Sequence, residues 1–587
     1  MGSYEVKKGV RMKNLQVSWM FRQIADLMEL KGEPSYKARA YRKAAKTIES
    51  LPVSIEEYSR GDRLLELPGV GVNLARKIKE ILETGRCSYL EQLKEEVPPG
   101  LLDVLQVPGI GTKTAVVIYR SLGITSLDEL ERQARAGKLR EIPRLGRRLE
   151  EKILAGIEFV KRKDGRVLLG WARPVAEGLA AALREEPAVE GVALAGSVRR
   201  WRETIGDIDL LAASREPDRV MNFFTGLPVV ERVLARDSTT SSVVVETGFQ
   251  VNLRVVEPRS FATALQYFTG SVDHNLQLRR LATEKGFKLS EYDLEDADGG
   301  KVLIREEAEI YARLGLPFIP PELREGRGEI EAAIEGQLPR LVEPGDIKGD
   351  LHVHTRWSDG ACEIEEMVEA ARKKGYQYLA ICDHSKSLAV ANGLDEKRLA
   401  RQREVIAELN QRYDDFTVLA GVEVDIRKDG TLDFPDEVLG ELDIVVASIH
   451  TGFGQGREEI TRRVFAALDH PLVDILAHPT GRLMGKRRGY EVDLEAVIAR
   501  AAEKGKVLEI NASPDRLDLS DVYVRKAVQQ GVPVVINTDA HSIYALDDMV
   551  FGIAVARRGW CEKGDVINTL PVVELLEWLG GRRRGLK

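Results

Sequence analysis

Cysteine is scarce in this chain of 587 residues, and its four cysteines are far apart. No two of them stand in a CxxC arrangement, which argues against a disulfide framework and a thiolate zinc site and favours a reducing compartment. The sequence also lacks an apolar run long enough to span a bilayer, and a signal-peptide pattern at its start. With 43% hydrophobic and 30% charged residues, the composition is that of a soluble globular protein, and the length predicts about three to five domains.

No excess of positive charge marks the chain as a whole, whose formal net charge is −7. The charge is nevertheless unevenly distributed, because residues 1–170 carry +9 while residues 171–345 and 346–587 carry −8 each. A phosphate-binding module followed by metal-binding carboxylate sites would give this distribution. Chance variation is the alternative interpretation.

The apolar pattern changes twice along the chain. Residues 12–165 have helical spacing with frequent Gly-Pro punctuation, and residues 190–295 contain β-branched runs that predict a mostly antiparallel sheet. Asp298-Gly299 predicts a hairpin turn. After a proline- and charge-rich segment at 316–346, seven apolar runs alternate with helical stretches. That alternation is typical of a parallel βα architecture.

The helical part repeats one short turn. Leu67-Pro68-Gly69-Val70-Gly71 and Val107-Pro108-Gly109-Ile110-Gly111 each lie between two predicted helices, and a weaker copy at 142–146 contains Arg144. A single copy would more often be a simple connecting turn. Two copies with matching flanks resemble the helix-hairpin-helix DNA-binding motif, in which N–H groups at a helix start bind phosphate. We therefore expect DNA contacts at Gly69, Gly71, Gly109 and Gly111.

Two aspartates mark the middle part of the chain. Asp207 and Asp209 are two residues apart on a predicted strand, so both carboxylates face the same side. Carboxylates this close repel each other unless a divalent cation lies between them. The preceding Gly196-Ser197 turn and Arg200 are suitably placed to hold a triphosphate. A solvated strand is the alternative, but strongly apolar flanks disfavour it.

The last part of the chain concentrates histidine, of which the whole sequence has only eight. Nearly every predicted strand after residue 349 ends in an imidazole or a carboxylate, and βα barrels build their sites at that end of their strands. Mixed imidazole and carboxylate ligands suit zinc, manganese or iron. Several such metals can generate hydroxide at neutral pH and clamp a phosphodiester. The pattern therefore predicts a metal-dependent phosphoesterase.

The middle part resembles the family X DNA polymerases. The resemblance rests on the motifs around Gly196, Asp207 and Asp209, on residues 267–271, and on residues 284–292. It implies that Asp207 and Asp209 bind Mg²⁺ or Mn²⁺, and that a lysine at the position of Lys77 attacks abasic sites through a Schiff base, a phosphate-contacting or solvated lysine being the alternative. The implied nucleotide- and template-side residues are Gly196, Ser197, Arg200, Gly206, Arg254, Tyr267, Phe268, Gly270, Asn275 and Arg279.

One position departs from that family. The family places a third carboxylate on a neighbouring strand, where this chain has Asn252. That carboxylate binds the metal that activates the primer 3′ hydroxyl, and an amide cannot supply its charge or accept a proton. We expect DNA and nucleotide binding with weak or absent polymerisation, whether Asn252 is natural decay or a deliberate change.

The last part resembles the PHP (polymerase and histidinol phosphatase) family, which binds up to three metals, here Mn²⁺ or Zn²⁺. The resemblance rests on the motif from Asp350 to Gly360 and the strand-end residues after it. Arg482, after the His478-Pro479 pair, is expected either to contact DNA phosphate or to form a surface ion pair. The nine implied metal ligands are His352, His354, Asp359, His384, Glu423, His450, His478, Asp539 and His541.

The order of these parts resembles the bacterial DNA polymerase X proteins. It implies a cytoplasmic, nucleoid-associated, monomeric base-excision-repair protein that takes gapped or nicked DNA and deoxynucleoside triphosphates, fills gaps and has a manganese-dependent 3′→5′ exonuclease. A small-molecule phosphatase fused to a DNA-binding module and a non-catalytic repair scaffold are the alternatives. The expected domains are a lyase-like helix-hairpin-helix domain at 12–95, a fingers-like subdomain at 96–165, an α+β nucleotidyltransferase palm at 166–260, a thumb at 261–320, a linker at 321–346 and a distorted (βα)7 barrel at 347–587.

Overall fold

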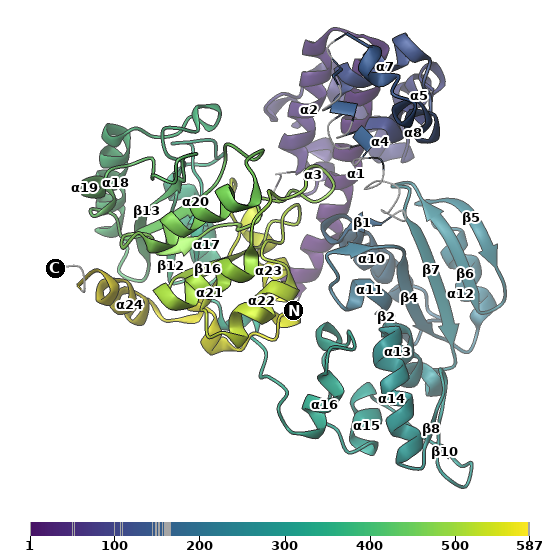
Figure 1. Ribbon diagram of the computed structural model, residues 1–587. Coiled ribbons are helices and arrows are strands. Elements are labelled where there is room, and N and C mark those ends of the chain that lie inside the picture. The colour runs from purple at the N-terminus through teal and green to yellow at the C-terminus, as the bar shows by residue number, and fades with distance from the viewer. Residues whose placement is uncertain are drawn as a thin grey trace. The chain divides into compact units, whose positions relative to one another are not determined.

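The chain folds into two compact units, residues 1–318 and 319–587, in the computed structural model (Figure 1). The structure describes residues 2–584 except 50, 52, 99, 106, 108, 109, 144, 147, 148, 151, 152, 155, 156 and 158–165. Within that part of the chain, no helix combines the length and the apolar character needed to cross a membrane.

The first unit begins with a helical region, as the sequence predicts. Glycines in the left-handed conformation end two of its helices, Gly85 after α4 and Gly123 after α7. The helices are α1 (Gly2–Lys31), α2 (Ser35–Glu49), α3 (Ile55–Arg60), α4 (Val72–Thr84), α5 (Ser88–Glu96), α6 (Gly100–Leu105), α7 (Thr112–Leu122) and α8 (Leu127–Arg135), with the short 3-10 turns η1 (Leu64–Glu66) and η2 (Leu139–Glu141).

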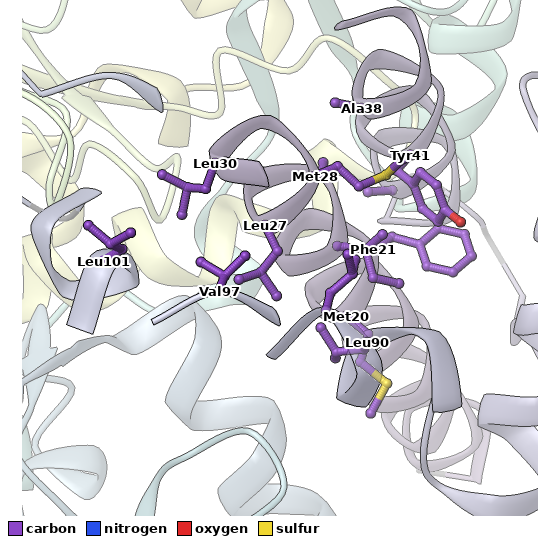
Figure 2. Packing of buried hydrophobic residues seen from close by; sticks show 14 of the residues in the cluster. Met20, Phe21, Leu27, Met28, Leu30, Ala38, Tyr41, Leu90, Val97 and Leu101 are labelled. Carbon is purple, nitrogen blue, oxygen red and sulfur yellow. The ribbon is translucent and has the colours of Figure 1, made fainter. Parts of the chain in front are cut away.

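One apolar core joins these helices (Figure 2). Phe21 of α1 is fully buried and meets the Tyr41 ring of α2 edge to face at 5.3 Å. Figure 2 shows Leu27 and Leu30 of the same helix beside Val97 and Leu101, so α1 packs against helices on more than one side. The long first helix therefore organises the helical part of this unit.

The predicted antiparallel sheet follows, with five strands in the order β2-β4-β7-β6-β5, of which only β4 and β7 pair in parallel. The edge strand β5 was not predicted, and most of it is exposed, so its apolar pattern is weak. The elements of this part of the chain are β1 (Val167–Leu168), α10 (Leu169–Arg184), β2 (Gly191–Leu194), α11 (Gly196–Arg199), β3 (Thr204–Ile205), β4 (Ile208–Ala213), α12 (Pro217–Thr225), β5 (Val230–Arg236), β6 (Thr240–Val245), β7 (Gln250–Val256) and η3 (Pro258–Ser260). β1 and β3 pair with each other in a separate two-stranded sheet.

A helical segment with a small sheet ends the first unit. Its three short strands pair in the order β10-β9-β8, and the predicted turn at Asp298-Gly299 lies between β9 and β10. The elements are α13 (Phe261–Thr269), α14 (Val272–Glu284), β8 (Lys288–Leu289), β9 (Leu294–Glu295), β10 (Lys301–Val302) and α15 (Glu307–Arg313).

The second unit is the predicted seven-stranded parallel barrel, with neighbouring strands in sequence order from β11 to β17 and helices around them (Figure 1). Its strands are β11 (Gly349–Val353), β12 (Tyr378–Ile381), β13 (Thr417–Asp425), β14 (Ile444–Ser448), β15 (Ile475–Leu476), β16 (Val507–Asn511) and β17 (Val534–Asn537). Its helices are α16 (Glu329–Ile334), α17 (Ile364–Lys373), α18 (Glu396–Asn410), α19 (Asp436–Leu439), α20 (Arg457–Asp469), α21 (Leu494–Lys504), α22 (Asp521–Gln529), α23 (Met549–Arg558) and α24 (Val572–Arg584), with short 3-10 turns between them.

The predicted linker packs on this second unit. Arg557 of α23 pairs with Glu322 at 2.8 Å, and the buried Arg558 pairs with Glu325 at 2.9 Å. Arg324 is fully buried and donates to the carbonyl of Ile319 at 2.8 Å. Residues 319–346 are therefore an ordered part of the barrel unit.

Side chains close the barrel between β11 and β17. The buried amide of Asn568 donates to the carbonyls of Gly349 and Ile536 at 2.9 and 2.6 Å, and its oxygen accepts from the N–H of Ile536 at 3.1 Å. Asn537 accepts from the N–H of Leu351 at 3.0 Å. These contacts hold the first strand beside the last, and hence the residues that follow both strands.

Replacing Asn568 with alanine is expected to loosen this seam. Three buried backbone groups lose their partner, at a cost of about 3 kcal/mol, which corresponds to an increase of about a hundredfold in amide exchange of β11 and β17. Hydrogen exchange read by mass spectrometry on peptides from these strands measures it. Asn410→Ala is the matched control, because Asn410 bonds both the N–H and the carbonyl of Val418 at 2.8 Å. Unchanged exchange at the seam in Asn568→Ala would contradict this account.

Candidate metal centres

A single buried carboxylate lies at the centre of the barrel site. Glu423, at the end of β13, is 1% exposed, and five imidazole nitrogens surround it. Its Oε1 lies 2.9 Å from His478 Nε2 and 3.4 Å from His450 Nε2. Its Oε2 lies 2.7 Å from His384 Nδ1 and 3.6 Å from both His352 Nε2 and His354 Nε2. Residues separated by up to 126 positions, from 352 to 478, therefore converge on one group.

The remaining predicted ligands extend this cluster. Asp539 Oδ1 is 3.1 Å from His354 Nε2, and Asp359 Oδ1 is 3.3 Å from His541 Nε2. All nine predicted residues therefore come together. Three overlapping sets place one ligand atom from each member within 4.8 Å of the others: His354, Asp359, His384 and His541; His352, His354 and Asp539; and His384, Glu423 and His450.

The unpaired atoms of the cluster fit metal ions. Among the described residues, Nδ1 of His354 and of His478 is buried without a hydrogen-bond partner, and the close contact of His384 Nδ1 with Glu423 Oε2 does not have the geometry of a hydrogen bond. The Nε2 atoms of His352 and His354 lie 3.1 Å apart. A neutral imidazole carries a proton on only one of its two nitrogens, so each ring keeps one nitrogen that can bind a metal. Buried polar atoms without partners are costly, and divalent cations would satisfy these.

Electrostatics keep two of the ligands, His354 and Glu423, in the form that binds metals. Burial and the neighbouring His541 and His384 lower the pKa of His354 to about 3, so its imidazole is neutral. Burial would raise the pKa of Glu423, but the imidazoles around it hold that pKa well below its ordinary value. Glu423 is therefore an ionised ligand at neutral pH.

Two further acids, Glu509 and Asp383, lie behind these ligands; the sequence placed them at strand ends but did not count them among the ligands. Glu509 accepts from His352 Nδ1 at 2.7 Å and from the His478 N–H at 2.8 Å. Asp383 accepts from the N–H and the hydroxyl of Thr355 at 2.8 and 2.6 Å, in the segment that leads to Asp359. Their signal in the sequence is that each is an acid near the end of an apolar run. Such partners fix imidazole orientation and tautomer.

Backbone strain also marks the site. His478 and Asp539 have positive φ angles of 27° and 55°, which non-glycine residues rarely adopt. Strain of this kind costs on the order of 1–3 kcal/mol and persists where surrounding structure imposes it, commonly at functional sites.

A second candidate centre lies on the five-stranded sheet. Asp209 of β4 pairs in register with Asn252 of β7, which places both beside Asp207. Burial, and then the charge of Asp207, raises the pKa of Asp209 to about 6. A side chain on Gly196 would come within 2.1 Å of Asp209 Oδ2, and its φ is +56°. Only glycine therefore fits there.

Asn252 occupies the third position with its amide turned toward the carboxylates. Its Nδ2 donates to Asp207 Oδ2 at 2.7 Å and to Asp209 Oδ1 at 3.2 Å. Its Oδ1 accepts from the Ser242 hydroxyl at 2.8 Å and from Gln250 Nε2 at 3.2 Å. The NH₂ group therefore faces the place where a cation would bridge the two acids, and the oxygen faces away. The two aspartates fit a divalent cation, but this orientation of the amide does not complete the site.

The predicted nucleotide-side residues surround this centre. A cavity of about 360 Å³ is lined in part by Asp209, Asn252, Arg254 and Phe268. The Arg254 guanidinium lies 4.4 Å from the Phe268 ring centroid and donates to the Tyr292 hydroxyl at 3.2 Å.

The remaining predicted nucleotide residues belong to α11, α13 and α14 and the turns beside them. Gly196 and Ser197 begin α11, and Arg200 directly follows that helix. The Arg200 guanidinium donates to the carbonyl of Thr269, next to Gly270. Asn275 Nδ2 donates to the carbonyl of Tyr267 at 2.7 Å, and Arg279 Nε to that of Leu289 at 3.1 Å. Gly206 immediately precedes Asp207.

The helix-hairpin-helix turns have the expected backbone. Gly69 has a φ of +86°, and a Cβ at this position would come within 3.0 Å of Lys43 Cγ. Gly71 and Gly111 directly precede α4 and α7 in extended conformation, and a Cβ on either would meet open space. Gly109 and Arg144 lie outside the described residues. Lys77 Nζ lies 4.7 Å above the Tyr89 ring.

Four family models match the chain in the order of these parts. They are the helix-hairpin-helix domain at residues 12–87, the SAM-like helix-hairpin-helix tandem at 101–158, the DNA polymerase beta thumb at 264–325 and the PHP domain at 350–513.

Known relatives match either the whole chain or one of its parts. The DNA polymerase/3′-5′ exonuclease PolX of Bacillus subtilis is 43% identical over 95% of this chain and 97% of its own length. A probable phosphatase of Thermoanaerobacter sp. is 30% identical over 40% of this chain and 95% of its own length. DNA polymerase lambda of Rattus norvegicus is 27% identical over 53% of this chain and 56% of its own length. The chain therefore belongs to the PolX family, the family X DNA polymerases that carry a C-terminal PHP domain.

Proposed function

We propose that this chain is a DNA-repair enzyme that binds gapped or nicked DNA and hydrolyses it from the 3′ end in its PHP domain, with a polymerase core that Asn252 impairs. The observation that carries this proposal is the Glu423 cluster, in which nine side chains suited to metal binding come together. Glu509 forms a hydrogen bond with one of them, His352. Full-length similarity to an enzyme named for both polymerase and exonuclease activity supports it.

In this proposal the nine ligands hold up to three Mn²⁺ or Zn²⁺ ions. When bound, such ions lower the pKa of water and neutralise the phosphodiester. Glu509 and Asp383 keep the ligands oriented, and neutral His354 is ready to bind. In the palm, Asp207 and Asp209 hold Mg²⁺ or Mn²⁺ with the nucleotide phosphates. We also propose that the protein is a monomer in the cytoplasm, associated with the nucleoid, and that the domain limits are those expected from the sequence, except that the linker at 321–346 belongs to the barrel unit.

Two finer assignments belong to the same proposal. The helix-hairpin-helix turns at Gly69, Gly71, Gly109 and Gly111 grip DNA phosphates, and the basic charge of residues 1–170 supports that role. Lys77 is a candidate lyase nucleophile for abasic sites. Its position over the Tyr89 ring is equally compatible with a phosphate contact.

A phosphatase acting on a small ester is the second candidate, because the PHP part resembles probable phosphatases over most of their length. The DNA-binding part argues against it. A 5′-labelled primer on gapped DNA, incubated with Mn²⁺ with and without nucleotides, separates the two. Shortening without extension is the expected result, and turnover of a small monoester without cleavage of DNA would contradict the proposal.

Removing the central charge is expected to abolish shortening. Glu423→Gln keeps the shape but not the charge that faces five imidazoles, so exonuclease turnover should fall at least about a hundredfold and bound manganese should decrease. Asp436→Asn is the matched control, since Asp436 also pairs with a histidine, His470, at 3.1 Å but on the surface. Near wild-type turnover of Glu423→Gln, measured on the labelled primer, would exclude the cluster as the nuclease centre.

Restoring the third carboxylate is expected to restore extension. In Asn252→Asp, the Ser242 hydroxyl and the Gln250 amide can still donate to one oxygen, while the other oxygen replaces the NH₂ group that faces Asp207 and Asp209. Primer extension should rise by roughly two to three powers of ten.

The Asn252→Asp experiment has two controls. Asp207→Asn in the same background should remove the gain, because it again leaves two carboxylates. Thermal unfolding should become more dependent on Mg²⁺, because three adjacent carboxylates repel each other without a cation. If extension does not increase, position 252 is not what limits the polymerase.

A further inference from the structure

A cationic side chain lies at the edge of the PHP cluster. Arg516, between β16 and α22, points its Nε at Asp539 Oδ2 from 3.4 Å, and its side chain is only 17% exposed. In the described part of the chain, no group accepts a hydrogen bond from its guanidinium. An arginine that is largely removed from water is usually matched by several acceptors. Most donors of Arg516 are therefore available to a ligand.

A second arginine lies close to the first. The Arg487 guanidinium lies 4.1 Å from the Phe453 ring centroid and donates to the carbonyl of Gly481 at 2.9 Å. Phe453 in turn stacks on the buried Tyr490 at 5.7 Å. Burial, and then the charge of Arg516, lowers the pKa of Arg487. The positive charges of Arg487 and Arg516 thus influence each other, and neighbouring cations favour the binding of an anion.

The loop that carries Arg516 is held rigidly. Arg482 Nε donates to the Arg516 carbonyl at 2.8 Å, and the same guanidinium also bonds the carbonyl of Leu517. Thr480 donates through its N–H and hydroxyl to Asp518 at 2.9 and 2.8 Å. Leu517 has a φ of 43°, in the left-handed region. The sequence left Arg482 open between a phosphate contact and an ion pair, and in the structure its guanidinium also anchors the segment that presents Arg516.

Pairing with Asp539 alone does not account for Arg516. The contact is a single long one, without the two parallel bonds that arginine commonly forms with a carboxylate. With a metal bound, Asp539 would serve as one of its ligands, and the donors of the Arg516 guanidinium beside it would remain free. A planar fork of donors matches two non-bridging phosphate oxygens.

We propose that Arg516, supported by Arg487, is the phosphate-binding residue of the PHP site and holds the non-bridging oxygens of the ester that is hydrolysed. This proposal rests on the proposed nuclease function for the identity of its substrate. A phosphodiester within a strand and a terminal phosphomonoester present the same oxygens, so the test includes both.

The test compares Arg516→Met and Arg516→Lys with the wild-type full chain. Hydrolysis of thymidine 5′-(4-nitrophenyl phosphate), a diester, and of 4-nitrophenyl phosphate, a monoester, is followed with Mn²⁺. We expect kcat/KM for the diester to fall about a hundredfold in Arg516→Met and about tenfold in Arg516→Lys, which keeps the charge but not the fork. Manganese content, measured by mass spectrometry, should remain that of the wild type.

A binding measurement makes the test independent of turnover. Calorimetric titration of the manganese-loaded protein with thymidine 5′-monophosphate should show binding at least tenfold weaker in Arg516→Met than in the wild type. Arg525→Met is the matched control, because Arg525 is also half-buried, lies 3.9 Å from the Trp560 ring and donates to a carbonyl. Its kinetics should equal those of the wild type.

Three outcomes are distinguishable. Loss of manganese in Arg516→Met would overturn the proposal, because Arg516 would then act by supporting Asp539. Wild-type kinetics and binding in Arg516→Met would also overturn it. If the wild type hydrolyses only the monoester, the nuclease function fails, while an Arg516-dependent loss of monoester turnover and of nucleotide binding would still support the phosphate site.

Discussion

The requirement to neutralise one buried carboxylate dominates the second unit of this protein. Glu423 has almost no exposure to water and is faced by five imidazoles. Despite burial, the charges of Glu509 and Glu423 raise the pKa of His352 and that of Glu423 raises the pKa of His384, so protonated imidazoles could balance part of this charge. Burial nevertheless keeps His354 neutral, and several ring nitrogens in the cluster have no hydrogen-bond partner among the described residues. Divalent cations resolve both problems, since they bind neutral imidazole and carboxylate together. The acids behind the ligands and the strained backbone at His478 and Asp539 hold this arrangement in place.

The barrel makes this convergence possible because its strands are parallel and it closes on itself. Each strand delivers its last residues to the same end, and the Asn568 and Asn537 amides bring β11 beside β17. His352 and Asp539 are 187 positions apart in the sequence, but they can therefore bind the same metal ion. Parallel pairing also brings residues together in the palm, where the register of β4 and β7 places Asp209 beside Asn252. There, however, the NH₂ group of Asn252 lies where a cation would be expected.

Much of this could be predicted from the sequence, and the remainder has physical reasons. Seven apolar runs that end in histidine or acid predicted the barrel and a metal site at one end of it, because parallel strands leave little choice about where their ends lie. The nine residues of the cluster were implied by the resemblance to the PHP family. The exposed edge strand β5 was missed since it has few buried side chains to form a pattern. Glu509 and Asp383 were not assigned to the site, because a hydrogen bond to a ligand leaves no periodic signal. Arg516 escaped notice for a related reason: its role depends on a three-dimensional contact with Asp539. The orientation of the Asn252 amide depends on Ser242 and Gln250 in the same way.

The two centres of this chain thus differ in their readiness for catalysis, with a complete ligand set in the barrel and a palm that lacks one charge. The most direct test of this difference is anomalous diffraction from crystals of the full chain soaked in Mn²⁺. The account predicts strong manganese peaks bonded to Glu423 and the surrounding imidazoles, with at most a weaker peak between Asp207 and Asp209. A cluster without manganese, in which Glu423 instead accepts hydrogen bonds from protonated imidazoles, would contradict it.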